Sequence, residues 1–161
     1  MYANHKICSE CGGTCCQRMP GLMSPEDVRR MFPAETLGQS LMLCLSNGKF
    51  VIDWWEGDPR GLDYDDPDYI STVEFIRPRA ISDRPRLHNR AWGIHDTCIF
   101  FSMVDGCSLE EDNRPLQCKM LEPGEKDCIM HEGGRKRDIA IMWIPHADLI
   151  ESVCDAIEDR E

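Results

Sequence analysis

The chain has 161 residues, of which 42% are hydrophobic and 29% charged, as is typical of one globular domain rather than a disordered segment. Its net charge of −11 argues against a general nucleic-acid binder, because such proteins present basic faces to phosphate. No run approaches the roughly 18 apolar residues of a membrane helix, and the N-terminus lacks a signal peptide's apolar core. We therefore expect a cytoplasmic protein with neither a membrane nor a nucleic-acid partner.

The first half of the chain contains local signals for two helices and a strand. The stretch SPEDVRRMF begins with an N-cap residue, Ser24, followed by proline and two acidic residues, which predicts a helix. A second helix is predicted over about Ala34–Cys44. Asn47-Gly48 is a turn signal, and the apolar run Phe50–Trp55 after it predicts a strand.

The second half mixes strand and helix signals. TVEFIRPRAI predicts a strand that Pro78 either ends or confines to an edge. CIFFSMVDGCSL predicts a hairpin around Asp105-Gly106. Near the C-terminus, a short apolar run over Ile139–Ile144 precedes an amphipathic helix predicted from about His146 to Glu158. These elements predict a small α+β domain with short helices, a few antiparallel strands and much irregular backbone around its cysteines.

The ten cysteines are unevenly distributed. A secreted chain would use so many thiols as a disulfide framework, but a reducing cytosol favours metal binding or, as a second choice, thiol redox chemistry. A C-x-x-C pair can bind one metal through a tight turn, and tetrahedral thiolate sites commonly draw ligands from two chain segments. The predicted metal ligands are Cys8, Cys11, Cys15 and Cys16 in a first group and Cys98, Cys107, Cys118 and Cys128 in a second.

Two questions about these ligands stay open at this point. Cys15 and Cys16 are adjacent, so one of them binds, each serves a different ion, or a polynuclear centre spans both. His131 follows Cys128 at C-x-x-H spacing and is either a further ligand or a solvated loop residue. Cys44 and Cys154 lie in apolar patterns and are predicted to pack in the core.

The two cysteine groups resemble the YkgJ-type cysteine-cluster family, which is described as zinc- or iron-chelating domains. The matching residues are Cys8-x-x-Cys11, the pair Cys15-Cys16, then Cys98, Cys107, and Arg114-Pro115 three residues before Cys118. The resemblance implies a metal or iron–sulfur centre. One relative, a flagellin lysine methylase, implies that some members are enzymes.

We therefore expect a single domain over 1–161, with an N-terminal ligand loop at 8–16, a later ligand segment at 98–131 and a variable middle insert at about 45–94. Ligand count favours an iron–sulfur cluster over Zn²⁺, in a structural or electron-transfer role. Arg114 is expected beside the cofactor, where its guanidinium offsets thiolate charge. The alternatives are a methyltransferase-like or other modifying enzyme built on the metal domain, or a metal-handling protein.

An arginine-rich segment at 77–90 stands out in this acidic chain. It is expected either to bind an anionic small molecule or protein partner, or to pair with the acidic loop at 63–68. Trp54 and Trp55 either pack in the core or an interface, or line a ligand pocket.

Overall fold

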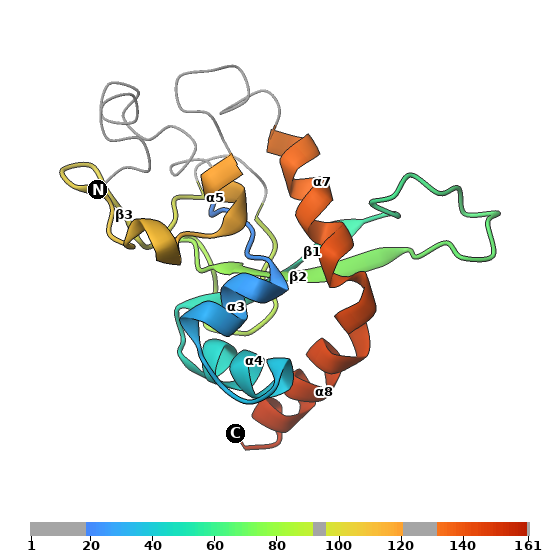
Figure 1. Ribbon diagram of the computed structural model, residues 1–161, viewed down its shortest axis with the longest axis horizontal. Helices are drawn as coiled ribbons and strands as arrows, with labels where there is room; N and C mark the ends of the chain where they lie inside the picture. Colours follow the sequence, from blue (N-terminus) through green and yellow to red (C-terminus); the bar gives the residue numbers. More distant parts are fainter. Residues whose placement is uncertain (1–18, 92–95, 121–131, 161) are drawn as a thin grey trace.

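The computed structural model describes residues 19–91, 96–120 and 132–160. A two-stranded antiparallel ribbon of β1 (Phe50–Glu56) and β2 (Thr72–Pro78) runs through its centre (Figure 1). A second, short antiparallel pair consists of β3 (Phe101–Ser102) and β4 (Gly106–Cys107). The helical elements are α3 (Pro25–Met31), α4 (Leu37–Ser46), η1 (Glu111–Asn113), α5 (Leu116–Met120), α7 (Glu132–Trp143), η2 (Ile144–His146) and α8 (Ala147–Glu158). The predicted α+β class is confirmed.

Side-chain caps determine where the first two helices begin. The hydroxyl of Ser24 accepts a hydrogen bond from the Asp27 amide at 3.1 Å, and the Asp27 carboxylate accepts one from the Ser24 amide at 2.8 Å. This reciprocal capping box starts α3 as predicted. Thr36 and Gln39 form the same arrangement before α4. The predicted start of α4 at Ala34 was therefore wrong by three residues.

Turn residues explain the ends of the strands. Gly48 has φ +84°, a left-handed conformation that glycine adopts without strain, and β1 starts two residues later. Pro78, which lacks an amide hydrogen for a further ladder bond, ends β2 as predicted. The predicted hairpin around Asp105-Gly106 is also confirmed, with φ +75° at Gly106 where β4 begins.

The core forms where α3, α4, α7 and α8 pack around the inner half of the ribbon. The apolar run that begins at Ile139 lies on α7, and the predicted C-terminal helix is confirmed as α8. The 45–94 stretch supplies β1 and β2 and is thus part of this core. The fully buried members of the core are Leu22, Met23, Val28, Leu41, Cys44, Ile52, Phe75, Ile76, Ile139, Ala140, Trp143 and Ile150. Among the described residues, no helix has the length and apolar character needed to cross a bilayer.

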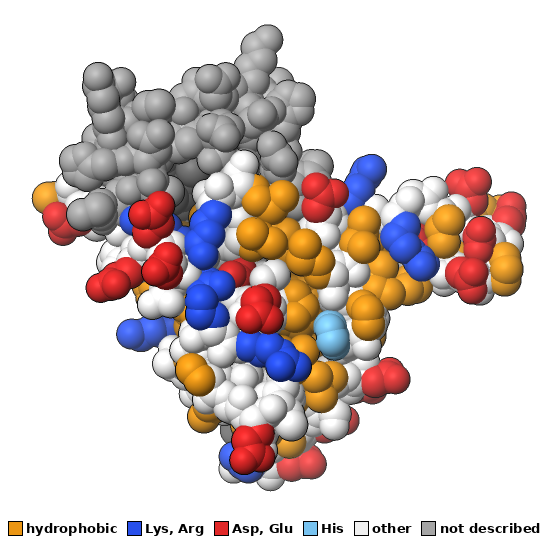
Figure 2. Space-filling model, in the orientation of Figure 1, with side chains coloured by type: hydrophobic (Ala, Val, Ile, Leu, Met, Phe, Trp, Pro, Cys, Tyr) orange, Lys and Arg blue, Asp and Glu red, His pale blue; other side chains and the backbone are white. Residues whose placement is uncertain are grey.

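The connection between β1 and β2 projects from the body as an arm, residues 57–71 (Figure 1). The Asp58 carboxylate organises its base by accepting hydrogen bonds from the Arg60 amide and guanidinium and from the Ile70 amide. The Arg60 hydrogen bonds hold the pKa of Asp58 far below its usual range. Acidic side chains gather at the tip of the arm (Figure 2), and the acidic stretch at 63–68 is therefore a loop, as expected from the sequence.

Candidate metal centre

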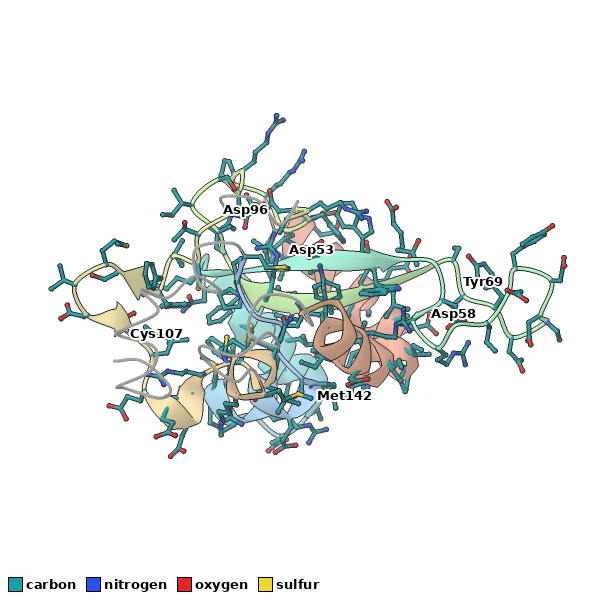
Figure 3. All side chains as sticks on the ribbon, turned by 90° about the horizontal axis from the view of Figure 1, so that it is seen from above. Asp53, Asp58, Tyr69, Asp96, Cys107 and Met142 are labelled. Atoms are coloured by element: carbon teal, nitrogen blue, oxygen red, sulfur yellow. The ribbon has the colours of Figure 1, made fainter. Side chains whose placement is uncertain are left out.

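The structure describes three of the eight predicted metal ligands. Cys98 is buried after the arginine-rich segment, while Cys107 on β4 and Cys118 on α5 are half-buried. Cys107 lies at the opposite end of the molecule from Asp58 and Tyr69 on the arm (Figure 3). The other predicted ligands lie outside the described residues, namely Cys8, Cys11, Cys15, Cys16, Cys128 and the candidate His131.

Cys118 lies against the chain that follows the first cysteine group. A methyl group at Gly21 would overlap the Cys118 sulfur and would lie 3.3 Å from the Cys118 backbone nitrogen. Only glycine therefore allows this close approach, because any other residue carries a Cβ. Gly21 comes five residues after Cys16. The sequence offered no signal for this contact.

Hydrogen bonds hold these two segments in register. The Leu22 amide donates to the side-chain oxygen of Gln117 at 2.8 Å, and the Gln117 amide donates to the Leu22 carbonyl at 3.2 Å. The Asp27 carboxylate also accepts a hydrogen bond from the Leu116 amide at 2.7 Å. Gln117 is buried, so these bonds form in a low-dielectric environment where an unpaired polar group would be costly. The start of α5 is thus tied to the segment after the first cysteine group.

Cys98 and Cys107 belong to one local unit. Cys98 pairs with Ala80 in an isolated antiparallel bridge, and its carbonyl accepts a hydrogen bond from the amide of Phe101 at 3.0 Å. Phe101 in turn pairs with Cys107 across the β3–β4 hairpin. Burial raises the pKa of Cys98 to about 12, and the neighbouring Cys107 thiol also raises it. Cys98 is therefore a neutral thiol at neutral pH.

Arg114, which lies between Cys107 and Cys118 in the sequence, carries a buried positive charge. Its side chain is 2% exposed, and its Nε donates to the Leu109 carbonyl at 3.2 Å. A buried guanidinium stabilises negative charge that develops on nearby groups. This placement is compatible with the expected role of Arg114 beside a thiolate-bound cofactor.

The described thiols do not form a metal site among themselves. Within 19–91, 96–120 and 132–160, no group of three or more histidine, cysteine or acidic side chains is arranged to hold a metal ion. Any centre that uses Cys98, Cys107 or Cys118 would need further ligands from outside these ranges. Cys44 and Cys154 belong to the hydrophobic core, as predicted, and burial raises the pKa of both thiols.

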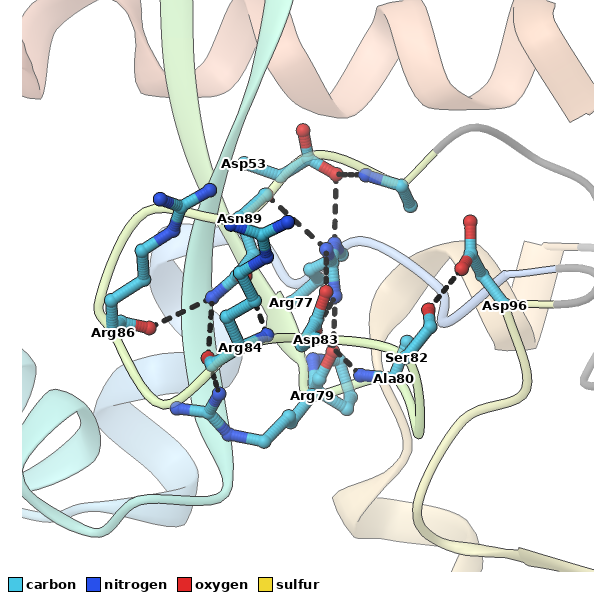
Figure 4. Close-up of polar contacts among 12 residues, drawn as sticks. Asp53, Arg77, Arg79, Ala80, Ser82, Asp83, Arg84, Arg86, Asn89 and Asp96 are labelled. Carbon is cyan, nitrogen blue, oxygen red and sulfur yellow. Dashed lines mark hydrogen bonds and ion pairs between the residues drawn. The ribbon is translucent and has the colours of Figure 1, made fainter.

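The first arginine of the 77–90 segment is a buried structural residue. Arg77 is fully buried on β2; its Nε donates to Asp53 at 2.8 Å, and its two terminal nitrogens bind both oxygens of Asp83 at 2.8 and 3.1 Å (Figure 4). The same nitrogens also donate to the carbonyls of Pro78 and Asn89. The expected pairing of Arg77 with the acidic loop at 63–68 was therefore wrong.

The remaining arginines of this segment are nearer the surface. The Arg79 guanidinium donates to the carbonyls of Gly48 and Arg84, and Arg90 forms an ion pair with Glu56 rather than with the acidic loop. Arg84 and Arg86 are exposed, so they are the arginines of the segment that an anionic partner would reach first.

The two tryptophans of β1 have different surroundings. Trp55 packs against the core and beneath the guanidinium of Arg137, 5.7 Å from its ring centroid. Trp54 lines a cavity of about 410 Å³ together with Glu74 and His88. Trp55 thus packs in the core, which was one of the two possibilities for the pair, and Trp54 lines a cavity.

Comparison of the chain with protein-family models, with curated proteins and with solved structures found no match.

Proposed function

We propose that the chain is a metal-binding protein whose centre is ligated by thiolates from both cysteine groups. The observation that carries the proposal is the close approach of Cys118 to Gly21. Five residues of extended chain span at most about 18 Å. A segment of five residues therefore joins Cys16, the last cysteine of the first group, to a residue that contacts a member of the second group.

The residues around Cys118 support a fixed ligand position. Gln117 and Leu22 form reciprocal hydrogen bonds on one side of the contact, so the backbone that carries the sulfur is held in place. Metal sites gain affinity from groups that orient their ligands before the metal arrives. Arg114, buried four residues earlier, would stabilise a centre with excess thiolate charge.

The proposed cofactor is an iron–sulfur cluster, with Zn²⁺ as the alternative. One tetrahedral zinc would use four of the eight grouped cysteines and leave four idle, whereas the adjacent Cys15 and Cys16 suit a compact polynuclear centre. The resemblance to the YkgJ-type family also implies a metal or iron–sulfur centre, and the role that we propose for it is structural or in electron transfer. A modifying enzyme or a metal-handling protein remains the alternative role.

We expect Cys118→Ser to lose bound metal, because a serine hydroxyl is a poor substitute for a thiolate ligand. Protein purified without oxygen would be analysed for iron, zinc and acid-labile sulfide, together with its visible spectrum. Cys154→Ser is the matched control. Cys154 lies on α8 and is buried in the hydrophobic core, so its substitution should affect only stability. Full metal occupancy in Cys118→Ser would refute the two-segment centre. Colourless protein with stoichiometric zinc and no sulfide would refute the cluster alone.

Gly21→Ala tests the close approach itself. The added methyl group would displace the Cys118 sulfur, so we expect metal affinity to fall by about 10- to 100-fold, the range for disturbed ligand orientation. Competition with a chromophoric chelator would measure the change. Gly38→Ala on α4 is the control, because its nearest neighbour is the flexible end of Leu149 at 3.1 Å. Equal chelator sensitivity in the two variants would show that the contact does not position a ligand.

A further inference from the structure

A shallow cavity of about 650 Å³ lies between α4 and α8, and none of its lining residues is a predicted metal ligand. Its walls are mainly apolar side chains, including Met42 and Leu43 on α4 and Leu149 on α8. Gly38 is one of its lining residues, and a Cβ there would lie 3.1 Å from the end of Leu149. The small residue lets the two helices approach closely and leaves a groove above them. We call this feature the α4–α8 groove.

The apolar surface of the groove is open to solvent. Leu43 is 51% exposed, although its neighbours Leu41 and Cys44 are fully buried on the opposite side of α4. On α8, Ile150, Cys154 and Ile157 face the core, whereas Leu149 and Ala156 line the groove. Leu149 also packs against the core, so α8 exposes only the outer part of this side chain, together with Ala156, to the groove.

α8 also carries carboxylates near the groove. α8 carries four acidic residues and no basic ones, and α4 has no charged residue. At 100° per residue, Asp148 and Asp155 lie one turn before and one turn after the groove residue Ser152, on the side of α8 away from the core. Both are exposed. An occupant of the groove thus meets an apolar floor and a negatively charged rim.

We propose that the α4–α8 groove binds an amphipathic helix of a partner protein, with an apolar ridge and a positively charged flank. Helices of this kind present anchors at i, i+3 or i+4, and i+7 to an apolar groove. The 10 residues of α4 and 12 of α8 make the groove walls about 15 to 18 Å long, which accommodates about three helical turns. A second copy of this chain would bring the same acidic rim and a net charge of −11, so charge disfavours it.

The probe for this proposal is a fluorescein-labelled amphipathic peptide of about 14 residues, made of leucine and lysine at helical spacing. Its binding to the full chain would be followed by fluorescence anisotropy. Leu43→Gln removes an exposed anchor, and we expect it to weaken binding about tenfold, as loss of a central anchor does. Ile81→Gln is the matched control, because Ile81 is 71% exposed outside the groove, and it should change the affinity less than about twofold.

A second pair of variants separates the acidic rim from net charge. Asp148→Asn with Asp155→Asn should weaken binding about tenfold. Asp63→Asn with Asp65→Asn on the arm changes the net charge equally and should leave binding unchanged. Equal losses in the two double variants would overturn the proposal in favour of non-specific attraction, and so would unchanged binding in Leu43→Gln. Self-association of the chain in light scattering, abolished by Leu43→Gln, would assign the groove to a second copy instead.

Discussion

Replacing Arg77 with methionine is expected to lower the free energy of unfolding by about 3 to 5 kcal/mol, the usual cost of removing one partner of a buried ion pair. Asp53 and Asp83 are both almost fully buried, and they would lose the cation that compensates their charges. Asp83 lies in the loop after β2, so the change would also remove the side-chain link between this loop and the ribbon, which Ile52 still joins through backbone hydrogen bonds to Leu87 and Asn89 (Figure 4). Urea denaturation followed by circular dichroism would measure the loss.

Two further variants define the origin of that effect. Arg77→Lys keeps the charge but cannot bind both oxygens of Asp83, so it should fall between the wild type and Arg77→Met. Arg30→Met removes a partly exposed partner of Asp27, whose carboxylate keeps its bonds to the Ser24 and Leu116 amides. It should cost less than about 1 kcal/mol. A loss in Arg77→Met no larger than in Arg30→Met would contradict the structural role of the buried arginine.

Trp143→Ala is expected to be comparably damaging, at about 3 to 5 kcal/mol, because it leaves a large cavity in a closely packed core. Trp143 is fully buried at the end of α7, and its indole nitrogen donates to the Met23 carbonyl at 2.7 Å. That hydrogen bond joins α7 to the segment that leads to the Gly21–Cys118 contact. Chemical denaturation would give the change in unfolding free energy.

Trp143→Phe distinguishes packing from hydrogen bonding at this position. Phenylalanine retains much of the apolar bulk but leaves the Met23 carbonyl unpaired, which should cost about 1 to 3 kcal/mol. Equal losses in the alanine and phenylalanine variants would mean that the hydrogen bond, and not the filled volume, accounts for the effect.

Local signals in the sequence determined most helix and strand boundaries. Ser24, Gly48, Pro78 and Gly106 act through their own backbone or through neighbours three residues away, so their consequences are visible without knowledge of the fold. The same holds for α8, whose apolar residues recur at helical spacing. Helix α7 was not predicted as a helix, because its sequence begins with E-G-G and glycine disfavours helix. Burial of Ile139, Ala140 and Trp143 against the core accounts for it.

The sequence by itself also determined that eight of the ten cysteines fall into two groups and that the other two, Cys44 and Cys154, pack in the core, which the structure confirms. Only the tertiary structure decided that Gly21 contacts Cys118, because the two residues are distant in the chain and meet through hydrogen bonds that no local pattern encodes. It likewise decided that Arg77 is buried. From the sequence alone, an arginine among other arginines is predicted to lie on the surface. The two carboxylate partners of Arg77 come together only when β1, β2 and the following loop have packed.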